Sequence, residues 1–368
     1  MPGGDPMTAS VPAEGEGIVN PLAPDLDHIL AHTRDLWDEL RGCRLFITGG
    51  TGFVGRWLLE SLLWANDRLQ LGVRAVVLTR DPKRFEASAP VLIAHPAIEL
   101  LAGDMCSFTL PDGRVDYVVH AATETVGMPG TYDPVHKFNA DIQGTRRVVA
   151  LAQERGARRL IFTSSGAVYG PQPAEMTHVH EEYPGAPDST DPWTAYGQAK
   201  RVSEFLCTAA AAAGGFEVVI ARCFAFAGPH LPLDSNYAIG NFLRDALAGG
   251  PVVVAGDGTP LRSYLYSADL AIWLWALLLR GQPSRIYNVG SDVGVSIEEL
   301  ARTVARIVSP GAEVKVLGRA PVGEPARRYV PSIDRARTEL GLKPLVSLTE
   351  AIERTAAWHR ARPTNESM

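Results

Sequence analysis

Short apolar segments recur along the first two thirds of the chain, and longer segments with helical spacing separate several of them. Apolar runs of four or five residues are typical of strands that are covered on both faces. Their alternation with helices is typical of parallel strands joined by crossover helices. We therefore predict an α/β fold with a doubly wound parallel sheet. Its strands are expected at Leu45–Ile47, Ala75–Leu78, Ile98–Leu101, Val115–Val119, Leu160–Thr163 and Val218–Ala221.

The segments on either side of this alternation have different patterns. The first residues are rich in Pro, Gly and small side chains and show no periodicity, which is typical of a flexible tail. Apolar residues in Asp25–Leu40 recur near a 3.6-residue spacing, which predicts an amphipathic helix packed on the sheet domain or on a partner subunit. After Gly228 the pattern breaks into loops and short helices. The predicted parts are a flexible tail over 1–24, an N-terminal helix over 25–41, a sheet domain over 42–225 with returning segments near 263–290, and a smaller interleaved substrate-binding region over 226–262 and 291–360.

Composition and charge exclude several classes of protein. A net charge of -6 and a pI near 5.9 provide no general attraction to nucleic acid or to a membrane surface. The four cysteines lie far apart without a Cys-x-x-Cys pair, so we expect no metal site and no disulfide framework. The longest apolar run, Ala271–Leu279, is about half of the roughly 20 residues that cross a bilayer. No targeting signal is evident, and we expect a cytoplasmic protein.

A glycine-rich turn lies between the first predicted strand and a helix. The stretch Thr48–Gly55 reads Thr-Gly-Gly-Thr-Gly-Phe-Val-Gly. At such a turn the first glycine permits a sharp bend, the second permits close approach to a pyrophosphate, and the third permits tight packing of the helix. The phosphates then lie at the positive end of the helix. We therefore predict a site for NAD or NADP, with Gly49, Gly52, Phe53, Val54 and Gly55 holding the cofactor.

Two further strand ends supply candidate cofactor contacts. The second strand ends at Thr79 and Arg80, where NAD-binding folds usually place a carboxylate for the ribose. Arg80 could instead hold the 2′-phosphate of NADP, which favours NADP, although Arg80 could also be a solvated charge. Asp81 could bend back to the ribose or cap the next helix. After the third strand, Asp104 and Met105 could contact adenine, or they could form an ordinary turn.

A tyrosine and a lysine four residues apart carry the predicted chemistry. Tyr196 and Lys200 share one face of a predicted helix, one turn apart. A neighbouring ammonium and a positive nicotinamide ring both lower the pKa of a phenol. Tyr196 could then remove a proton from a sugar hydroxyl while hydride leaves the carbon. Ser165, about thirty residues upstream, would bond to the same oxygen, and its neighbour Ser164 is expected at the cofactor.

These motifs together resemble the extended short-chain dehydrogenase/reductases, and specifically the NAD-dependent epimerase/dehydratase family that acts on nucleotide sugars. The resemblance covers about residues 43 to 359 and implies a Rossmann-type fold. It implies that Ala121 and Ala122 line the cofactor, that Asn139 supports the helix carrying Tyr196 and Lys200, and that Arg262 grips the nucleotide diphosphate. The matching stretches are the glycine turn, His120-Ala121-Ala122, the run around Asn139, Ser164-Ser165 with Val168-Tyr169-Gly170, Tyr196 with Lys200, Gly228-Pro229, Gly256-Asp257-Gly258 with Arg262, and Asn288-Val289-Gly290.

The departures from this family are informative. The 4,6-dehydratases carry an Asp-Glu pair after the catalytic Ser or Thr, and the decarboxylases tend to carry a Glu nearby. Here the two positions are Gly166 and Ala167, which cannot carry a proton. Ala225 replaces an Asn that touches the nucleotide in many relatives, which indicates an altered pocket. Thr123 and Phe224 are expected to contact the substrate, and the aromatic residues that could line the pocket are Trp193, Phe224, Phe226 and Tyr237, unless some are core residues.

The sequence therefore leaves more than one function open. We favour an epimerase that acts on a nucleotide sugar, at C4 and through a transient 4-keto intermediate. The alternative is an NADPH-dependent reductase of nucleotide 4-keto-sugars, and a more remote one is a cofactor-binding sensor without catalysis. The resemblance also implies a homodimer, formed by the helices predicted at Pro134–Arg155 and Thr194–Ala213.

Overall fold

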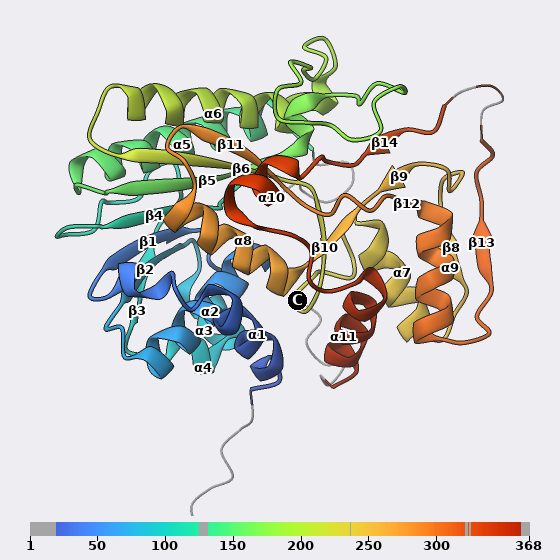
Figure 1. The fold of residues 1–368 in the computed structure, drawn as a ribbon, viewed down its shortest axis with the longest axis horizontal. Coiled ribbons are helices and arrows are strands. Elements are labelled where there is room, and N and C mark those ends of the chain that lie inside the picture. The colour runs from blue at the N-terminus through green and yellow to red at the C-terminus, as the bar shows by residue number, and fades with distance from the viewer. Residues whose placement is uncertain (1–19, 125–131, 236, 321–322, 324, 362–368) are drawn as a thin grey trace, which may run out of the picture.

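One large parallel sheet organises the computed structural model of the chain (Figure 1). The structure describes residues 20–124, 132–235, 237–320, 323 and 325–361, so most of the predicted tail lies outside the described residues. The sheet has seven strands in the order β11-β6-β5-β4-β1-β2-β3. Every neighbouring pair is parallel. The prediction of a doubly wound parallel sheet is confirmed.

The strands of this sheet contain the predicted apolar segments. Their bounds are β1 Arg44–Thr48, β2 Arg74–Thr79, β3 Ile98–Ala102, β4 Tyr117–His120, β5 Arg159–Ser165, β6 Glu217–Cys223 and β11 Arg285–Val289. The start of β4 differs from the predicted Val115, because the Val115 amide donates to the carbonyl of Arg155 at 3.1 Å instead of joining a ladder. The last strand, β11, comes from far along the chain and pairs with β6 at the edge of the sheet.

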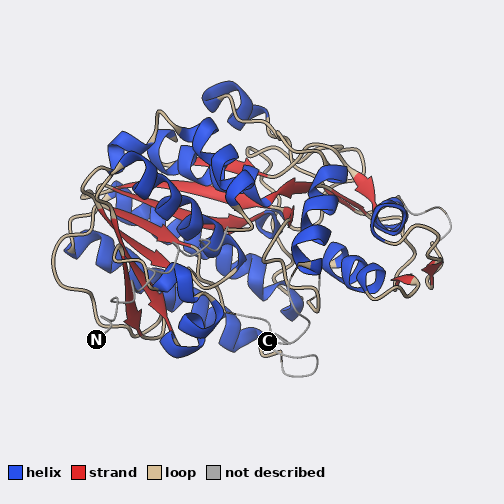
Figure 2. Ribbon diagram, turned by 90° about the horizontal axis from the view of Figure 1, so that it is seen from below, coloured by secondary structure: helices blue, strands red, loops and turns tan. Residues whose placement is uncertain are grey.

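Successive residues of each strand face opposite sides of the sheet, and both sides are buried. In β1, Leu45 and Ile47 lie in the core cluster shared with α2 (Phe53–Leu69) and α8 (Ser267–Arg280). Phe46, between them, lies in the cluster on the other face, under α5 (Pro134–Glu154) and α6 (Ala195–Ala212). Figure 2 shows helices on both sides of the strands. This two-sided burial explains why the strands are apolar throughout.

The N-terminal segment packs on the sheet domain, which is one of the two positions predicted for it. It is not a single helix, however. It consists of α1 (Ala23–Thr33) and the 3-10 helix η1 (Trp37–Leu40). The Thr33 hydroxyl donates to the Ile29 carbonyl at 2.6 Å and accepts from the Trp37 indole at 2.9 Å. This bond fixes the Trp37 ring against Trp275 of α8, with ring centroids 5.1 Å apart. The break in the helix therefore allows Trp37 to enter the core.

The remaining elements build the edges of the molecule. The small sheets pair β10 with β7, β13 with β8, and β9 with both β12 and β14. Figure 1 shows β8, β13 and α9 at the side of the molecule away from β1 to β3. The elements are α3 Pro82–Ser88, α4 Pro90–Ile93, η2 Gly166–Tyr169, η3 Pro192–Thr194, β7 Ala225–Ala227, α7 Ala238–Leu247, β8 Val252–Val254, β9 Leu261–Arg262, β10 Tyr264–Tyr266, β12 Val295–Ser296, α9 Ile297–Val308, β13 Val314–Val316, β14 Arg328–Tyr329, α10 Asp334–Leu340 and α11 Leu348–Arg360.

His120 joins four elements at the carboxyl end of β4. Its Nδ1 lies 2.8 Å from the hydroxyl of Thr48 in β1, and its Nε2 lies 3.1 Å from the hydroxyl of Thr145 in α5. The Thr145 hydroxyl is in turn 2.9 Å from that of Ser203 in α6. Burial, followed by the nearby charge of Lys200, lowers the pKa of His120 to about 3. The imidazole is therefore neutral in the folded protein at ordinary pH.

This burial predicts a specific loss of stability in acid. Below about pH 6.5 the unfolded chain protonates at His120 while the folded chain stays neutral, so the free energy of unfolding falls as the pH falls toward 3. Between pH 7 and pH 5, protonation of His120 in the unfolded chain should lower the free energy of unfolding by about 2 kcal/mol. Denaturant unfolding at both pH values should show that extra loss in the wild type and not in His120→Gln. Equal losses in both proteins would contradict the neutral buried imidazole.

Candidate active site

The glycine turn between β1 and α2 leaves an open space at the start of the helix. Gly49 has φ +72°, and a Cβ there would lie 2.6 Å from the backbone of Ala121 and Ala122. A Cβ on Gly55 would lie 2.2 Å from the Gly49 carbonyl oxygen, so both approaches require glycine. A Cβ on Gly52 would meet only one atom within 4 Å, at 3.5 Å.

The same space presents backbone amides that no side chain caps. Gly52 is the N-cap of α2, and no side chain bonds to the first amides of the helix. Phe53 and Val54 are the first residues of α2. Free amides at a helix N-terminus attract an anion, and the absence of a Cβ on Gly52 permits close contact. The residues present therefore fit the pyrophosphate of a dinucleotide.

The end of β2 places a cation near this space but also gives it a partner. The Arg80 side chain is 59% exposed, and its Nη1 lies 3.4 Å from each carboxylate oxygen of Glu124. Asp81 caps α3 by accepting from the Arg84 amide at 3.0 Å, so it does not bend back toward a ribose. Thr79 is buried, and its hydroxyl accepts from the Asp81 amide at 3.3 Å.

The residues after β3 form a turn that packs under α5. The Asp104 carboxylate accepts from the Cys106 amide at 2.8 Å, which is the ordinary turn considered as the alternative. Met105 is 8% exposed and lies in the core. A Cβ on Gly144 of α5 would lie 2.9 Å from the Met105 side chain, so the two elements are in close contact. This placement indicates a packing role for Met105.

Lys200 lies in the most buried part of the site. Its ammonium donates to the Thr163 carbonyl of β5 at 2.9 Å and lies 4.8 Å from the centroid of the Phe162 ring. The side chain is buried, and this burial lowers the pKa of Lys200 to about 8. Asp141 is the next cause and raises that pKa, because its carboxylate favours the ammonium.

Tyr196 lies one turn before Lys200 on α6, between the lysine and Ser165. The Lys200 ammonium is 5.8 Å from the centroid of the Tyr196 ring. Burial raises the pKa of Tyr196, and a hydrogen bond with the Ser165 side chain lowers it. The Ser165 hydroxyl also accepts from the Ala167 amide at 3.1 Å. The structure therefore brings together the three residues that the sequence predicts to be catalytic.

A wall of two aromatic residues closes the space beside Gly166. A Cβ on Gly166 would lie 2.7 Å from both the Phe224 ring and the Tyr329 hydroxyl. The Tyr329 hydroxyl is 3.5 Å from that of Ser165. Burial raises the pKa of Tyr329 to about 12, so it is a neutral donor. No side chain longer than hydrogen fits at position 166 without moving this wall. Tyr329 is not among the residues that the sequence predicts at the site.

Arg262 lies next to this wall, and it has no acidic partner among the residues that the structure describes. In the paired strands β9 and β14, Arg262 is directly opposite Tyr329, and its guanidinium is 5.6 Å from the centroid of that ring. Its Nη1 donates to the Leu261 carbonyl at 2.9 Å. Burial lowers the pKa of Arg262. None of the salt bridges among the described residues involves it, so it is available to an anionic ligand.

The predicted aromatic lining does not form one cluster. Phe224 is in the wall, whereas Phe226 packs on Phe53 at the start of α2, with centroids 6.4 Å apart. Trp193 is 75% exposed and stacks on Tyr132, with centroids 5.0 Å apart. Tyr237 is 58% exposed. Of the four candidates, Phe224 therefore lies at Gly166, and Tyr237 is close enough to Tyr196 to raise its pKa.

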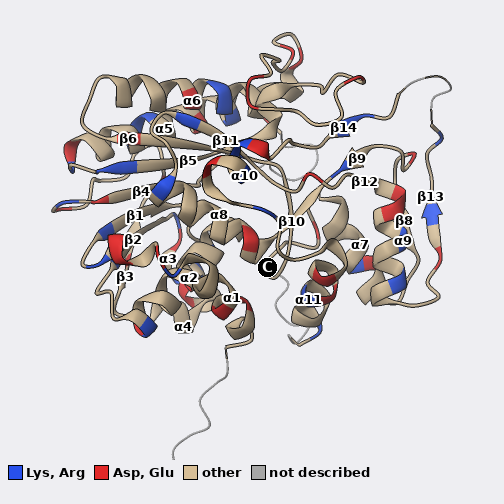
Figure 3. Ribbon diagram, in the orientation of Figure 1, with Lys and Arg blue, Asp and Glu red and all other residues tan. Residues whose placement is uncertain are grey.

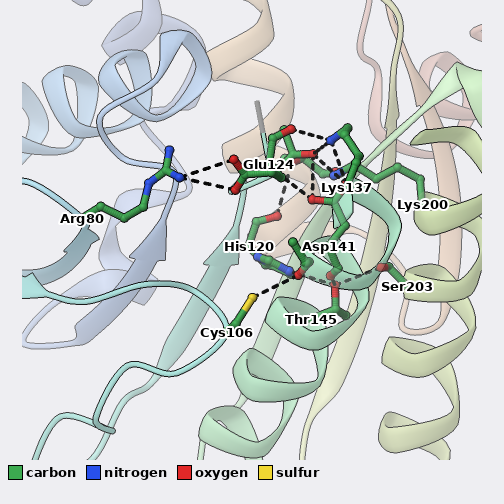
Figure 4. A network of polar contacts seen from close by, with 12 residues as sticks. Arg80, Cys106, His120, Glu124, Lys137, Asp141, Thr145, Lys200 and Ser203 are labelled. Atoms are coloured by element: carbon green, nitrogen blue, oxygen red, sulfur yellow. Dashed lines mark hydrogen bonds and ion pairs between the residues drawn. The ribbon is translucent and has the colours of Figure 1, made fainter. Parts of the chain in front are cut away.

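A network of buried polar groups supports the site from α5, but Asn139 is not part of it. The Asn139 side chain is exposed. Asp141 is buried and bonds to the Thr123 hydroxyl at 3.1 Å and to the Glu124 amide at 2.7 Å. Lys137 lies beside Asp141 (Figure 4). The structure therefore gives Asp141 the supporting position expected of Asn139.

Three further observations on the described residues concern metal binding, the distribution of charge and membrane insertion. No cluster of three or more His, Cys, Asp or Glu side chains among those residues could hold a metal ion. Acidic and basic residues are interspersed along the helices (Figure 3), as in the pair of Glu298 and Arg302 at 2.6 Å on α9. None of the described helices is long and apolar enough to span a membrane.

Comparisons with known proteins agree with this geometry. The model of the NAD dependent epimerase/dehydratase family matches residues 45–290. UDP-glucuronic acid decarboxylase 3 of Arabidopsis thaliana is 30% identical over 314 residues, which is 84% of this chain and 86% of the relative.

Solved structures extend the match to the fold. The dTDP-glucose 4,6-dehydratase DesIV of Streptomyces venezuelae, solved with NAD, is 26% identical with a TM-score of 0.71, covering 86% of this chain and 97% of that one. UDP-glucuronic acid 4-epimerase of Bacillus cereus, solved with UDP-glucuronic acid and NAD, has a TM-score of 0.71 at 22% identity, covering 86% and 99%. The chain is therefore an enzyme of the NAD-dependent epimerase/dehydratase family.

Proposed function

We propose that this enzyme oxidises and reduces one ring carbon of a nucleotide sugar, with epimerisation at C4 as the net reaction. The observation that carries this proposal is the closed wall at Gly166, beside Ser165, Tyr196 and Lys200. Elimination of water requires an additional acid and base, which neither Gly166 nor Ala167 can provide, and neither position carries the Glu that decarboxylases tend to have nearby. Oxidation and reduction require only the three residues that are present.

Each of these residues has a defined part in the proposed reaction. A bound nicotinamide dinucleotide would supply the acceptor and the donor of hydride. Tyr196 would take the proton from the C4 hydroxyl and return it to the same oxygen. Ser165 would donate its hydroxyl proton to that oxygen, because its own oxygen already accepts from the Ala167 amide. The Lys200 ammonium favours the phenolate form of Tyr196 through its positive charge.

Arg262 and Thr123 support a nucleotide-sugar substrate. The Arg262 guanidinium has no carboxylate partner among the described salt bridges, and a diphosphate is the ligand that would neutralise it. Thr123 follows β4, and Asp141 fixes its hydroxyl. The Arabidopsis relative is named for action on UDP-glucuronic acid, and so is the Bacillus cereus structure. UDP-glucuronic acid is therefore the first substrate to test, with UDP-glucose as the second.

The proposed reaction predicts an epimer and no other product. Purified enzyme with UDP-glucuronic acid or UDP-glucose, without added reductant, should form the C4 epimer with no net change in cofactor absorbance. Deuterium from the solvent should not enter carbon positions, because only protons on oxygen exchange. Tyr196→Phe should lower the rate roughly 100- to 10,000-fold through loss of proton transfer, with cofactor still bound. Tyr117→Phe, at the amino end of β4, is the matched control.

Other products would contradict the assignment of this enzyme as a C4 epimerase. Release of carbon dioxide from UDP-glucuronic acid, or a 4-keto-6-deoxy product from UDP-glucose, would refute the role given to Gly166 and Ala167. Stoichiometric oxidation of NADPH by a 4-keto-sugar, without interconversion of saturated sugars, would indicate the reductase. Product identification by nuclear magnetic resonance distinguishes these outcomes from the C4 epimer.

The choice between NAD and NADP depends on Arg80. If Arg80 leaves Glu124 to bind a 2′-phosphate, Arg80→Ala should weaken NADP by about 1 to 3 kcal/mol, the worth of a charge-assisted contact. NAD lacks that phosphate and should bind almost unchanged. Calorimetric titration of cofactor-free protein measures both affinities, with the exposed Arg84→Ala as control. Equal effects on the two cofactors would remove Arg80 from the site.

A homodimer through α5 and α6 is the proposed assembly. These helices pack side by side on one face of the sheet, and Phe205 of α6 is 69% exposed. Small-angle scattering at micromolar concentration should give the mass of two chains. Phe205→Glu should give one chain, because an interface does not tolerate a buried unpaired charge. Leu317→Glu, at another exposed position, should remain dimeric, and a monomeric wild type would contradict the proposal.

A further inference from the structure

Lys137 is a second buried ammonium group beside Tyr196. Its side chain is 4% exposed, and its Nζ lies 4.9 Å from the centroid of the Tyr196 ring, compared with 5.8 Å for Lys200. Lys137 belongs to α5, whereas Lys200 belongs to α6, and Figure 4 shows the two side chains close together. The phenol is therefore approached by cations from two neighbouring helices.

The Lys137 ammonium is held in place by three acceptors. It donates to the Thr123 hydroxyl at 3.1 Å, to the Asp141 carboxylate at 3.0 Å and to the carbonyl of Glu124. An ammonium has three protons to donate, so these contacts use all of them. Lys137 thus has a fixed position and fastens the segment after β4 to α5.

Asp141 is the counter-ion that Lys137 shares with Lys200. Its carboxylate is 3.0 Å from Lys137. Burial lowers the pKa of Lys200, the Asp141 carboxylate raises it, and the charge of Lys137 lowers it further. Asp141 is 4% exposed, so solvent screens these interactions weakly. Two ammonium groups and one carboxylate leave a net charge of about +1 beside the phenol when both lysines are protonated.

The other groups that face Tyr196 are a thiol and three hydroxyls. They come from β5, β6, β14 and the residue before α7. Burial raises the pKa of both Cys223 and Tyr329 to about 12, so both are protonated at ordinary pH. The remaining two are the hydroxyls of Ser165 and Tyr237. Within the described residues, Lys137 and Lys200 are the cations that lie against the Tyr196 ring.

We propose that Lys137 is a positioning residue for the acid-base chemistry of Tyr196. Its ammonium, with Asp141 as counter-ion, stabilises the phenolate of Tyr196. It also holds the Thr123 hydroxyl, which we expect to contact the substrate. The inference rests on the proposed function only in taking Tyr196 as the group that exchanges the proton.

The test measures ionisation of Tyr196 without any sugar. Ultraviolet absorbance of the phenolate is titrated in the cofactor-loaded enzyme, and the Tyr196→Phe protein provides the background from the other tyrosines. Lys137→Met should raise the pKa of Tyr196 by about one unit, which means roughly tenfold less phenolate at a fixed pH. Lys137→Arg keeps the charge and should restore most of the shift. The acidic limb of the activity profile, below which Tyr196 is protonated and cannot take the proton, should move to higher pH in parallel.

Control variants separate this effect from a loss of structure. Lys315→Met breaks an ion pair on the surface, where Lys315 lies 3.3 Å from Glu313, and should shift nothing. Lys137→Met leaves the buried Asp141 without its donor, so Lys137→Gln, whose amide can still donate to Asp141, is titrated beside it. A raised pKa of Tyr196 in whichever of these variants folds supports the proposal.

Two outcomes distinguish this inference from the proposed function. An unchanged pKa of Tyr196 in every folded variant that lacks the Lys137 ammonium would overturn the role of Lys137, even if the wild type epimerises its substrate. A raised pKa in an enzyme that turns over no nucleotide sugar would uphold Lys137 and refute the proposed reaction.

Discussion

The burial of a lysine at the carboxyl edge of the sheet is the constraint on which the site depends. An ammonium away from water is costly unless acceptors and an opposite charge surround it. The Thr163 carbonyl supplies an acceptor from β5, and Asp141 supplies the charge from α5. The helix that carries Lys200 must therefore pack against both elements. That packing also places Tyr196 beside Ser165, so the catalytic geometry follows from satisfying one buried cation.

Close backbone approaches give the site its shape on either side of this cation. Gly49 allows the turn after β1 to touch the backbone after β4, which brings the proposed cofactor space next to the end of β4. Gly166 allows Phe224 and Tyr329 to lie against the end of β5. The first approach creates space for a ligand, whereas the second removes the space that an acidic side chain would need. Both effects come from the absence of a Cβ.

The ion pair between Arg80 and Glu124 has different energetics from the buried network behind it. The Arg80 side chain is mostly exposed, so solvent screens its attraction to Glu124 and the pair contributes little to stability. A phosphate could therefore replace Glu124 at small cost. The pair formed by Lys137 and Asp141 is buried, and loss of either partner would leave an uncompensated charge. We expect the first pair to respond to ligands and the second to remain intact.

The features that the sequence predicted correctly depend on short-range patterns. Apolar runs identify strands because both faces of a parallel sheet are buried, and closely spaced glycines identify the turn between β1 and α2 locally. Tyr196 and Lys200 are one helical turn apart, so any helix places them on one face. The bounds of α5 and α6 also agree with prediction to within a residue.

The features that the sequence missed depend on which face of an element is buried and on contacts between distant segments. Asn139 and Asp141 are two residues apart, so they lie on nearly opposite sides of α5, and only packing against β4 and α6 selects Asp141. Tyr329 meets Ser165 across 164 positions of sequence. No local pattern encodes that meeting, because it arises where β14 pairs with β9 at the end of the large sheet. Such contacts exist only once the chain has folded.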